Sequence, residues 1–151
     1  MLRVVLDGES RLIDFELFTE FAQTVREILN DAGRIDRRRV VTFRIADLHA
    51  SSPTILLEAV PETDDEATLE AVTKRVSTDL ARLEESGVLP DWMGTPTVER
   101  LHRMAAKFGD TPIDGFTFSE GEQTARLTRE TYLHLDRVLH ATTDAIGSVT
   151  G

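Results

Sequence analysis

The chain contains no cysteine among its 151 residues. This absence excludes disulfide bonds, thiolate nucleophiles and cysteine-ligated zinc or iron–sulfur sites. Long apolar runs are also absent, since none approaches the roughly 18 residues that a membrane-spanning helix needs. The apolar run at the N-terminus, residues 2–6, is too short for a signal peptide, so we expect a cytoplasmic protein of bacterial type that binds no membrane.

Positive charge is scarce and unevenly placed. Lysine and arginine together number 17 against 27 acidic residues, which gives a net charge of −10. A general nucleic-acid binder needs a basic face to neutralise phosphates, so this composition argues against one. Residues 34–50 are the exception, with five arginines, two aspartates and a net charge of +3. The length predicts a single domain over residues 1–151.

Apolar periodicity in the first third predicts a strand followed by a helix. Residues 2–6 alternate as a half-buried strand does, and Asp14 is placed to cap the helix that follows. Gly33 is expected to end that helix in a left-handed cap conformation. The expected apolar face of the helix consists of Phe15, Phe18, Phe21, Ala22, Val25, Ile28 and Leu29.

The rest of the chain predicts two hairpins and three more helices. Residues 40–48 and 55–60 are separated by a short connection and indicate an antiparallel hairpin. A capping box at Thr63 and Glu66 opens a long helix, and the pair Thr95–Pro96 opens a shorter one. Residues 116–118 and 124–127 indicate the second hairpin, before a last helix. The order βαββααββα favours an α+β fold, with an antiparallel or mixed sheet packed by amphipathic helices.

The segment 47–53 has the composition closest to that of a catalytic site. Asp47, His49 and Ser51 supply the carboxylate, imidazole and hydroxyl used in nucleophilic catalysis. Triad members, however, converge from separate parts of a fold, and no serine here lies in a glycine-flanked elbow. A hairpin loop whose polar side chains bond nearby backbone amides explains the same residues. We lean against an enzyme, and these three residues are the candidates if it is one.

Metal and cofactor binding are not expected. His134 and His140 lie about 240° apart around the last predicted helix, so they cannot share one metal ion. The HExxH spacing is absent, and no cluster supplies three ligands for a catalytic zinc. No glycine-rich phosphate loop is present either.

Four arginines, Arg34, Arg37, Arg38 and Arg39, form the basic cluster. One interpretation is an anion-binding patch, because guanidinium groups bind phosphate or carboxylate in a bidentate manner. The other is structural: positive charge after a helix C-terminus offsets the helix dipole, or pairs with the protein's own acidic helices.

Trp92 and Met93 lie in the linker 88–94, after a Pro-Asp turn. A lone tryptophan in such a segment pins the linker to the core or forms the hot spot of an interface. Both interpretations remain open.

Two short motifs resemble an uncharacterised group of small bacterial α+β proteins. They are Val5-Leu6-Asp7-Gly8 and the segment Asp47–Pro53, which follows a strand. Proteins of that group accompany small toxin-like nucleases, so the resemblance implies an antitoxin-like partner role. The residues themselves favour a non-catalytic interaction or regulatory module that binds another protein or itself. The alternative is a small enzyme or anion-binding domain that uses the Asp47–Ser52 loop and the arginine cluster.

If the protein is an interaction module, Trp92→Ala should weaken its assembly by about 2 kcal/mol, the size of an interface hot spot. His49→Ala should then leave assembly unchanged. The measurement is the binding affinity of each variant for its protein partner or for a second copy. A loss with His49→Ala and none with Trp92→Ala would favour chemistry at the Asp47–Ser52 loop instead.

Overall fold

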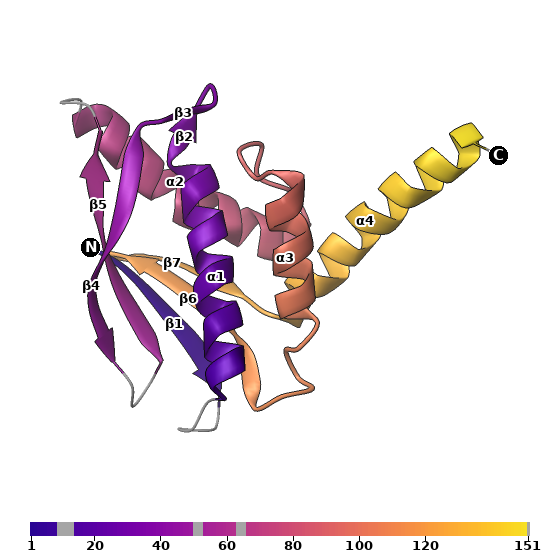
Figure 1. Cartoon of the computed structure of the whole chain (residues 1–151), viewed down its shortest axis with the longest axis horizontal. Coiled ribbons are helices and arrows are strands. Elements are labelled where there is room, and N and C mark those ends of the chain that lie inside the picture. The colour runs from indigo at the N-terminus through magenta and orange to yellow at the C-terminus, as the bar shows by residue number, and fades with distance from the viewer. Residues whose placement is uncertain (9–13, 50–52, 63–65, 151) are drawn as a thin grey trace.

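The computed structural model describes residues 1–8, 14–49, 53–62 and 66–150, with side chains up to residue 141 apart from that of His49. The elements are β1 Leu2–Gly8, α1 Phe15–Ala32, β2 Arg34–Ile35, β3 Arg38–Arg39, β4 Val41–His49, β5 Thr54–Pro61, α2 Glu66–Ser86, α3 Thr95–Ala105, β6 Ile113–Glu120, β7 Gln123–Leu127 and α4 Arg129–Thr150 (Figure 1). The predicted α+β order is confirmed, with one addition, the small pair β2–β3. Within the described part, no helix is both long and apolar enough to cross a membrane.

Five strands form one antiparallel sheet in the order β4-β5-β1-β6-β7. Strand β1 is central in this order, and its alternate side chains Leu2, Val4 and Leu6 are buried on one face of the sheet. The opposite face carries exposed side chains such as Arg3, which lies beside Leu56 of β5 and Ser119 of β6. The sheet is therefore covered by helices on one face and open on the other.

One hydrophobic core lies between the helices and the covered face. Phe116 of β6 is its centre, with its ring 5.0 Å from Phe21 of α1 and 5.2 Å from Phe108, which follows α3. The core also takes residues from α2 and α4, among them Leu80 and Leu135. Beyond this contact α4 extends away from the rest of the molecule (Figure 1).

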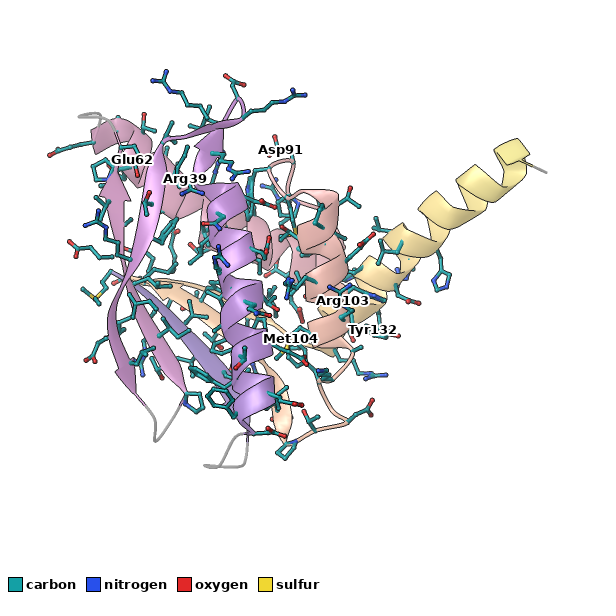
Figure 2. All side chains as sticks on the ribbon, viewed as in Figure 1. Arg39, Glu62, Asp91, Arg103, Met104 and Tyr132 are labelled. Atoms are coloured by element: carbon teal, nitrogen blue, oxygen red, sulfur yellow. The ribbon has the colours of Figure 1, made fainter. Side chains whose placement is uncertain are left out.

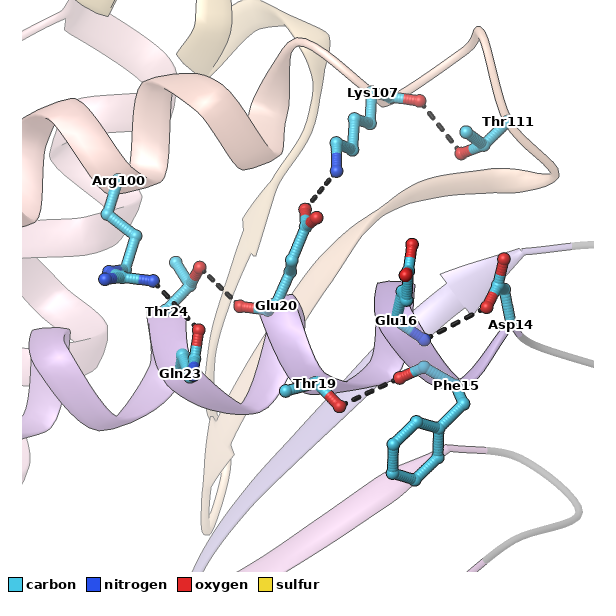
Figure 3. A network of polar contacts seen from close by, with 10 residues as sticks. All are labelled: Asp14, Phe15, Glu16, Thr19, Glu20, Gln23, Thr24, Arg100, Lys107 and Thr111. Carbon is cyan, nitrogen blue, oxygen red and sulfur yellow. Dashed lines mark hydrogen bonds and ion pairs between the residues drawn. The ribbon is translucent and has the colours of Figure 1, made fainter.

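The start of α1 follows the predicted cap but not the whole predicted apolar face. Asp14 accepts a hydrogen bond from the Glu16 backbone N–H at 3.0 Å, as expected of an N-cap residue. Phe15, predicted to face the core, is 82% exposed instead. Figure 3 shows its ring on the side of α1 opposite to Glu20 and Lys107, which form an ion pair with each other. The prediction was wrong because, at about 100° per residue, Phe15 lies about 120° around the helix from the buried Phe21, outside the face that packs on the core.

The end of α1 corrects a second expectation. Gly33 has φ −78° and ψ 5°, so it is not in the left-handed conformation. Glycine is required there by contact: a Cβ atom would lie 2.3 Å from the Val41 carbonyl oxygen. The Gly33 carbonyl in turn accepts hydrogen bonds from the N–H groups of Val40 and Val41. The chain thus leaves α1 and returns to the sheet at one point of close backbone approach.

We expect Gly33→Ala to lower the free energy of unfolding by about 1–3 kcal/mol, because the added methyl group forces two backbone segments apart. Gly94→Ala is the matched control, since its Cβ would meet no atom closer than Asp31 Oδ2 at 3.5 Å. Urea denaturation of both variants checks this; an equal loss of stability in the two would contradict the steric explanation.

Candidate functional site

A groove of about 700 Å³ lies where the C-terminus of α1, hairpin β2–β3, helix α2 and the turn before α3 meet. We call it the Trp92 groove. Its lining residues are Asp31, Arg34, Ile35, Asp36, Arg37, Arg75, Asp91, Trp92 and Gly94. It therefore brings together two features that the sequence suggested separately, part of the arginine cluster and the linker tryptophan.

Arg75 of α2 joins the walls of the groove. Its Nη2 donates hydrogen bonds to the backbone carbonyl oxygens of Ala32 and, at 2.7 Å, of Arg34. It thus supplies the positive charge at the C-terminus of α1, where the last turn has no basic residue of its own. Its Nε is buried without a hydrogen-bond partner among the described residues. Burial lowers the pKa of this guanidinium, against the opposing effect of Asp91 and Asp79.

Sequence reasoning missed Arg75 as a site residue. It occupies a polar position of a long amphipathic helix, and its carbonyl partners lie 41 and 43 residues earlier in the chain. No local pattern signals such a contact. The unusual feature, a cation shared by three segments, exists only after α1 and α2 have packed together.

Trp92 and Met93 have different surroundings. The Trp92 indole N–H donates to Asp79 Oδ2 at 2.7 Å, and its half-buried ring lies 5.8 Å from the Arg75 guanidinium carbon. Met93 is 7% exposed and belongs to the core. Trp92 therefore pins the linker to α2 and also lines a groove. Its role as an interface hot spot stays a prediction, and Met93 presents almost no surface to a partner.

The four arginines of the cluster lie on or beside the turn of hairpin β2–β3. Arg34 pairs with Arg39 across the hairpin, and its turn residues Asp36 and Arg37 have positive φ, 52° and 66°. Such paired positive values fit a two-residue hairpin turn. Figure 2 shows Arg39 and Asp91 at the end of the molecule from which this hairpin projects.

All four guanidinium-bearing side chains of the cluster are exposed. In the part of the chain that the structure describes, none of them forms an ion pair with a carboxylate. At the end of α1 it is Arg75, not the cluster, that donates to the terminal carbonyl groups. Whether the cluster balances the protein's acidic helices stays a prediction.

The groove also contains acidic groups. Asp31, Asp36 and Asp91 line it together with Arg34, Arg37 and Arg75, so the charges are equal in number. The Asp31 carboxylate is already engaged, because its Oδ2 accepts the Gly94 backbone N–H at 2.9 Å. This bond fixes the turn before α3 to the end of α1.

The catalytic candidates lie elsewhere. Asp47 and His49 belong to the last residues of β4, and Asp47 Oδ1 accepts the Leu48 backbone N–H at 2.8 Å. Ser51 and the His49 side chain lie outside the described residues. Strand β4 separates His49 from the arginine hairpin by eight residue steps, or about 26 Å. Asp47 and the His49 backbone therefore lie at the opposite end of β4 from the arginine hairpin.

A further polar cluster joins α3 to α4. His102 Nε2 lies 3.0 Å from Asp136 Oδ1, and its ring stacks on Tyr132 at 5.0 Å. Asp136 also pairs with His140 at the expected i,i+4 spacing. Among the residues that the structure describes, no group of three or more acidic or histidine side chains is arranged to hold a metal ion.

Comparison with known proteins finds no match to any family model, curated protein or solved structure.

Arg75→Met should lower the free energy of unfolding by about 1–3 kcal/mol, because two carbonyl groups lose a charged donor and one of them ends a helix. The matched control is Arg82→Met on the same helix, where the side chain is exposed. Thermal and urea denaturation of both variants measures the difference. Similar stabilities for the two variants would contradict the role of Arg75 at the end of α1.

Proposed function

We propose that the protein is a non-catalytic interaction module whose Trp92 groove binds an acidic segment of a partner protein. The observation that carries this proposal is the exposed arginine cluster without carboxylate partners in the described part of the chain, beside a half-buried tryptophan. Arginine and tryptophan are the residue types that most often dominate protein interfaces.

The net charge of −10 does not prevent an acidic segment from binding there. At physiological ionic strength, exposed charges are largely screened beyond about 8 Å. A ligand in the groove therefore responds to the arginines that touch it more than to distant acidic helices. The net negative charge should still slow the association of an acidic ligand, and this effect should be stronger at low salt concentration, where screening is weaker.

A protein segment fits the groove better than a free phosphate does. Three carboxylates line the groove beside the arginines and oppose a compact polyanion. A peptide carries backbone N–H donors as well as acidic side chains, so it can satisfy both kinds of group. The ring of Trp92 adds apolar area that an inorganic ion cannot use.

The resemblance to partners of toxin-like nucleases gives one class of protein to test in the groove. A joint site of the Asp47–Ser52 loop and the arginine cluster is not proposed, because β4 places Asp47 and the His49 backbone at its far end, about 26 Å from the hairpin.

Intrinsic fluorescence provides a direct test, because Trp92 is the only tryptophan. The probe is a short synthetic peptide of alternating glutamate and leucine, with a glutamine-for-glutamate peptide of the same length for comparison. We expect the acidic peptide to shift the Trp92 emission and the amide peptide to bind at least about tenfold more weakly, since each charged hydrogen bond contributes about 1.5–3 kcal/mol.

The double variant Arg34→Gln/Arg37→Asn should weaken binding of the acidic peptide by about tenfold or more. Asparagine tolerates the positive φ of position 37. The control, Arg103→Gln/Arg137→Asn, removes two exposed arginines from α3 and α4 and should bind as the wild type does. Equal affinity of wild type and groove variant, or equal binding of both peptides, would refute the proposal.

A further inference from the structure

The outer edge of β4 is an exposed sheet edge. Strand β4 is the first in the sheet order, so among the described residues it has a strand neighbour on one side only. Ile45 is 62% exposed and Leu48 is 52% exposed. Both lie on the helix-covered side of the sheet, since Ile45 is opposite the buried Leu57 and Leu48 is opposite the buried Ile55. A long edge with apolar side chains is a site for strand addition.

The pattern of hydrogen bonds shows which backbone groups of β4 face outward. In an antiparallel ladder alternate residues bond to the same neighbour. The Val40 carbonyl accepts the Glu62 N–H, so residues 40, 42 and 44 face β5, while 41, 43 and 45 face the outer edge. In agreement with this, the Val41 N–H donates to Gly33 on that side. After the bulge between Ile45 and Asp47, the outward residue is Leu48, and its N–H is held by the Asp47 carboxylate.

We propose that β4 pairs with β4 of a second copy of this chain, antiparallel, about a twofold axis at Ile45. The outward groups of Ile45 then meet those of the partner's Ile45. Those of Phe43 meet those of the partner's Leu48. The two five-stranded sheets become one continuous sheet. This surface is separate from the Trp92 groove, so neither proposal depends on the other.

Charge selects this register. Arg44 is opposite Glu58 of β5, and Asp47 is opposite Leu56. Because Glu58 and Leu56 are two residues apart, they point to the same face of the sheet, the open one, and so do Arg44 and Asp47. The bulge leaves one paired position between them, which Ile45 occupies. A twofold axis at Ile45 therefore places Arg44 opposite the partner's Asp47, and does so twice. Moving the axis to Arg44 or to Asp47 would place two like charges opposite each other instead.

The same register matches the apolar side. Ile45 meets its own copy at the axis, and the exposed Leu48 covers the half-buried Phe43 of the other subunit. Arg44 and the partner's Asp47 form a non-hydrogen-bonded pair, the type in which side chains approach most closely. Pairing exchanges the local bond of the Leu48 N–H to Asp47 for a main-chain bond, and the proposed register places Arg44 of the partner subunit opposite Asp47.

Sedimentation velocity over a concentration series tests the proposal on the full chain. The wild type should form a dimer as concentration rises. Arg44→Asp and Asp47→Arg should each raise the dimer dissociation constant by about tenfold, because each creates two like-charge pairs. The double variant restores opposite charges and should return the constant to within about threefold of the wild type.

Arg3→Asp is the control, since it reverses an exposed charge on the same open face in the central strand. It should leave the dissociation constant unchanged. Thermal denaturation identifies variants that fail to fold. If Arg44→Asp fails to fold beside Glu58, Asp47→Arg and Ile45→Lys carry the test, and both should abolish or weaken the dimer. A monomer at every concentration overturns the proposal, as does a folded double variant that is no tighter than the single ones.

Discussion

The arrangement of this molecule depends on one cation, the Arg75 guanidinium at the C-terminus of α1. Its Nη2 holds carbonyl oxygens of Ala32 and Arg34, so α2 is fixed to the point where α1 ends and hairpin β2–β3 begins. The same guanidinium lies over the Trp92 ring, whose N–H binds Asp79 one helical turn after Arg75. A helix end, a hairpin and a linker thus share one charged group, and the groove is the space that they leave between them. Burial opposes its charge, and the nearby Asp79 and Asp91 offset part of that cost.

The backbone contact at Gly33 is the second constraint, and it links the fold to the proposed dimer. The Gly33 carbonyl accepts the Val41 N–H, which covers the outer edge of β4 at its first residue. From Phe43 to Leu48, no described strand pairs with this edge. A side chain at position 33 would push the two backbones apart, because its Cβ would lie 2.3 Å from the Val41 oxygen. The contact that closes the fold at one end of β4 therefore leaves the other end available for pairing.

Local patterns predicted the elements well and the contacts between them poorly. The helical spacing of Phe21, Val25 and Ile28 is determined by burial, so it identified α1 correctly. Phe15 also fits a three- and four-residue spacing with Phe18 and Ala22, but it lies outside the buried face, and the spacing alone did not show how wide that face is. Hairpin β2–β3 was missed because two-residue strands of exposed arginines have no apolar alternation. The groove could not be predicted for a different reason. The arginine cluster and Trp92 each have a sequence signal, but the contact of Arg75 with the end of α1 exists only after the helices pack.

Uneven charge explains how an acidic protein can have two surfaces with opposite local requirements. Its net charge of −10 acts over long distances and is screened by salt, whereas recognition occurs between groups in contact. Hairpin β2–β3 gathers four arginines away from carboxylate partners in the described part of the chain, which favours an acidic ligand. Strand β4 instead has one cation, Arg44, and one anion, Asp47, on either side of Ile45 in the ladder. This arrangement favours the proposed pairing with β4 of a second copy. Both proposed surfaces use residues of the segment 34–50, which has a net charge of +3 in a molecule whose net charge is −10.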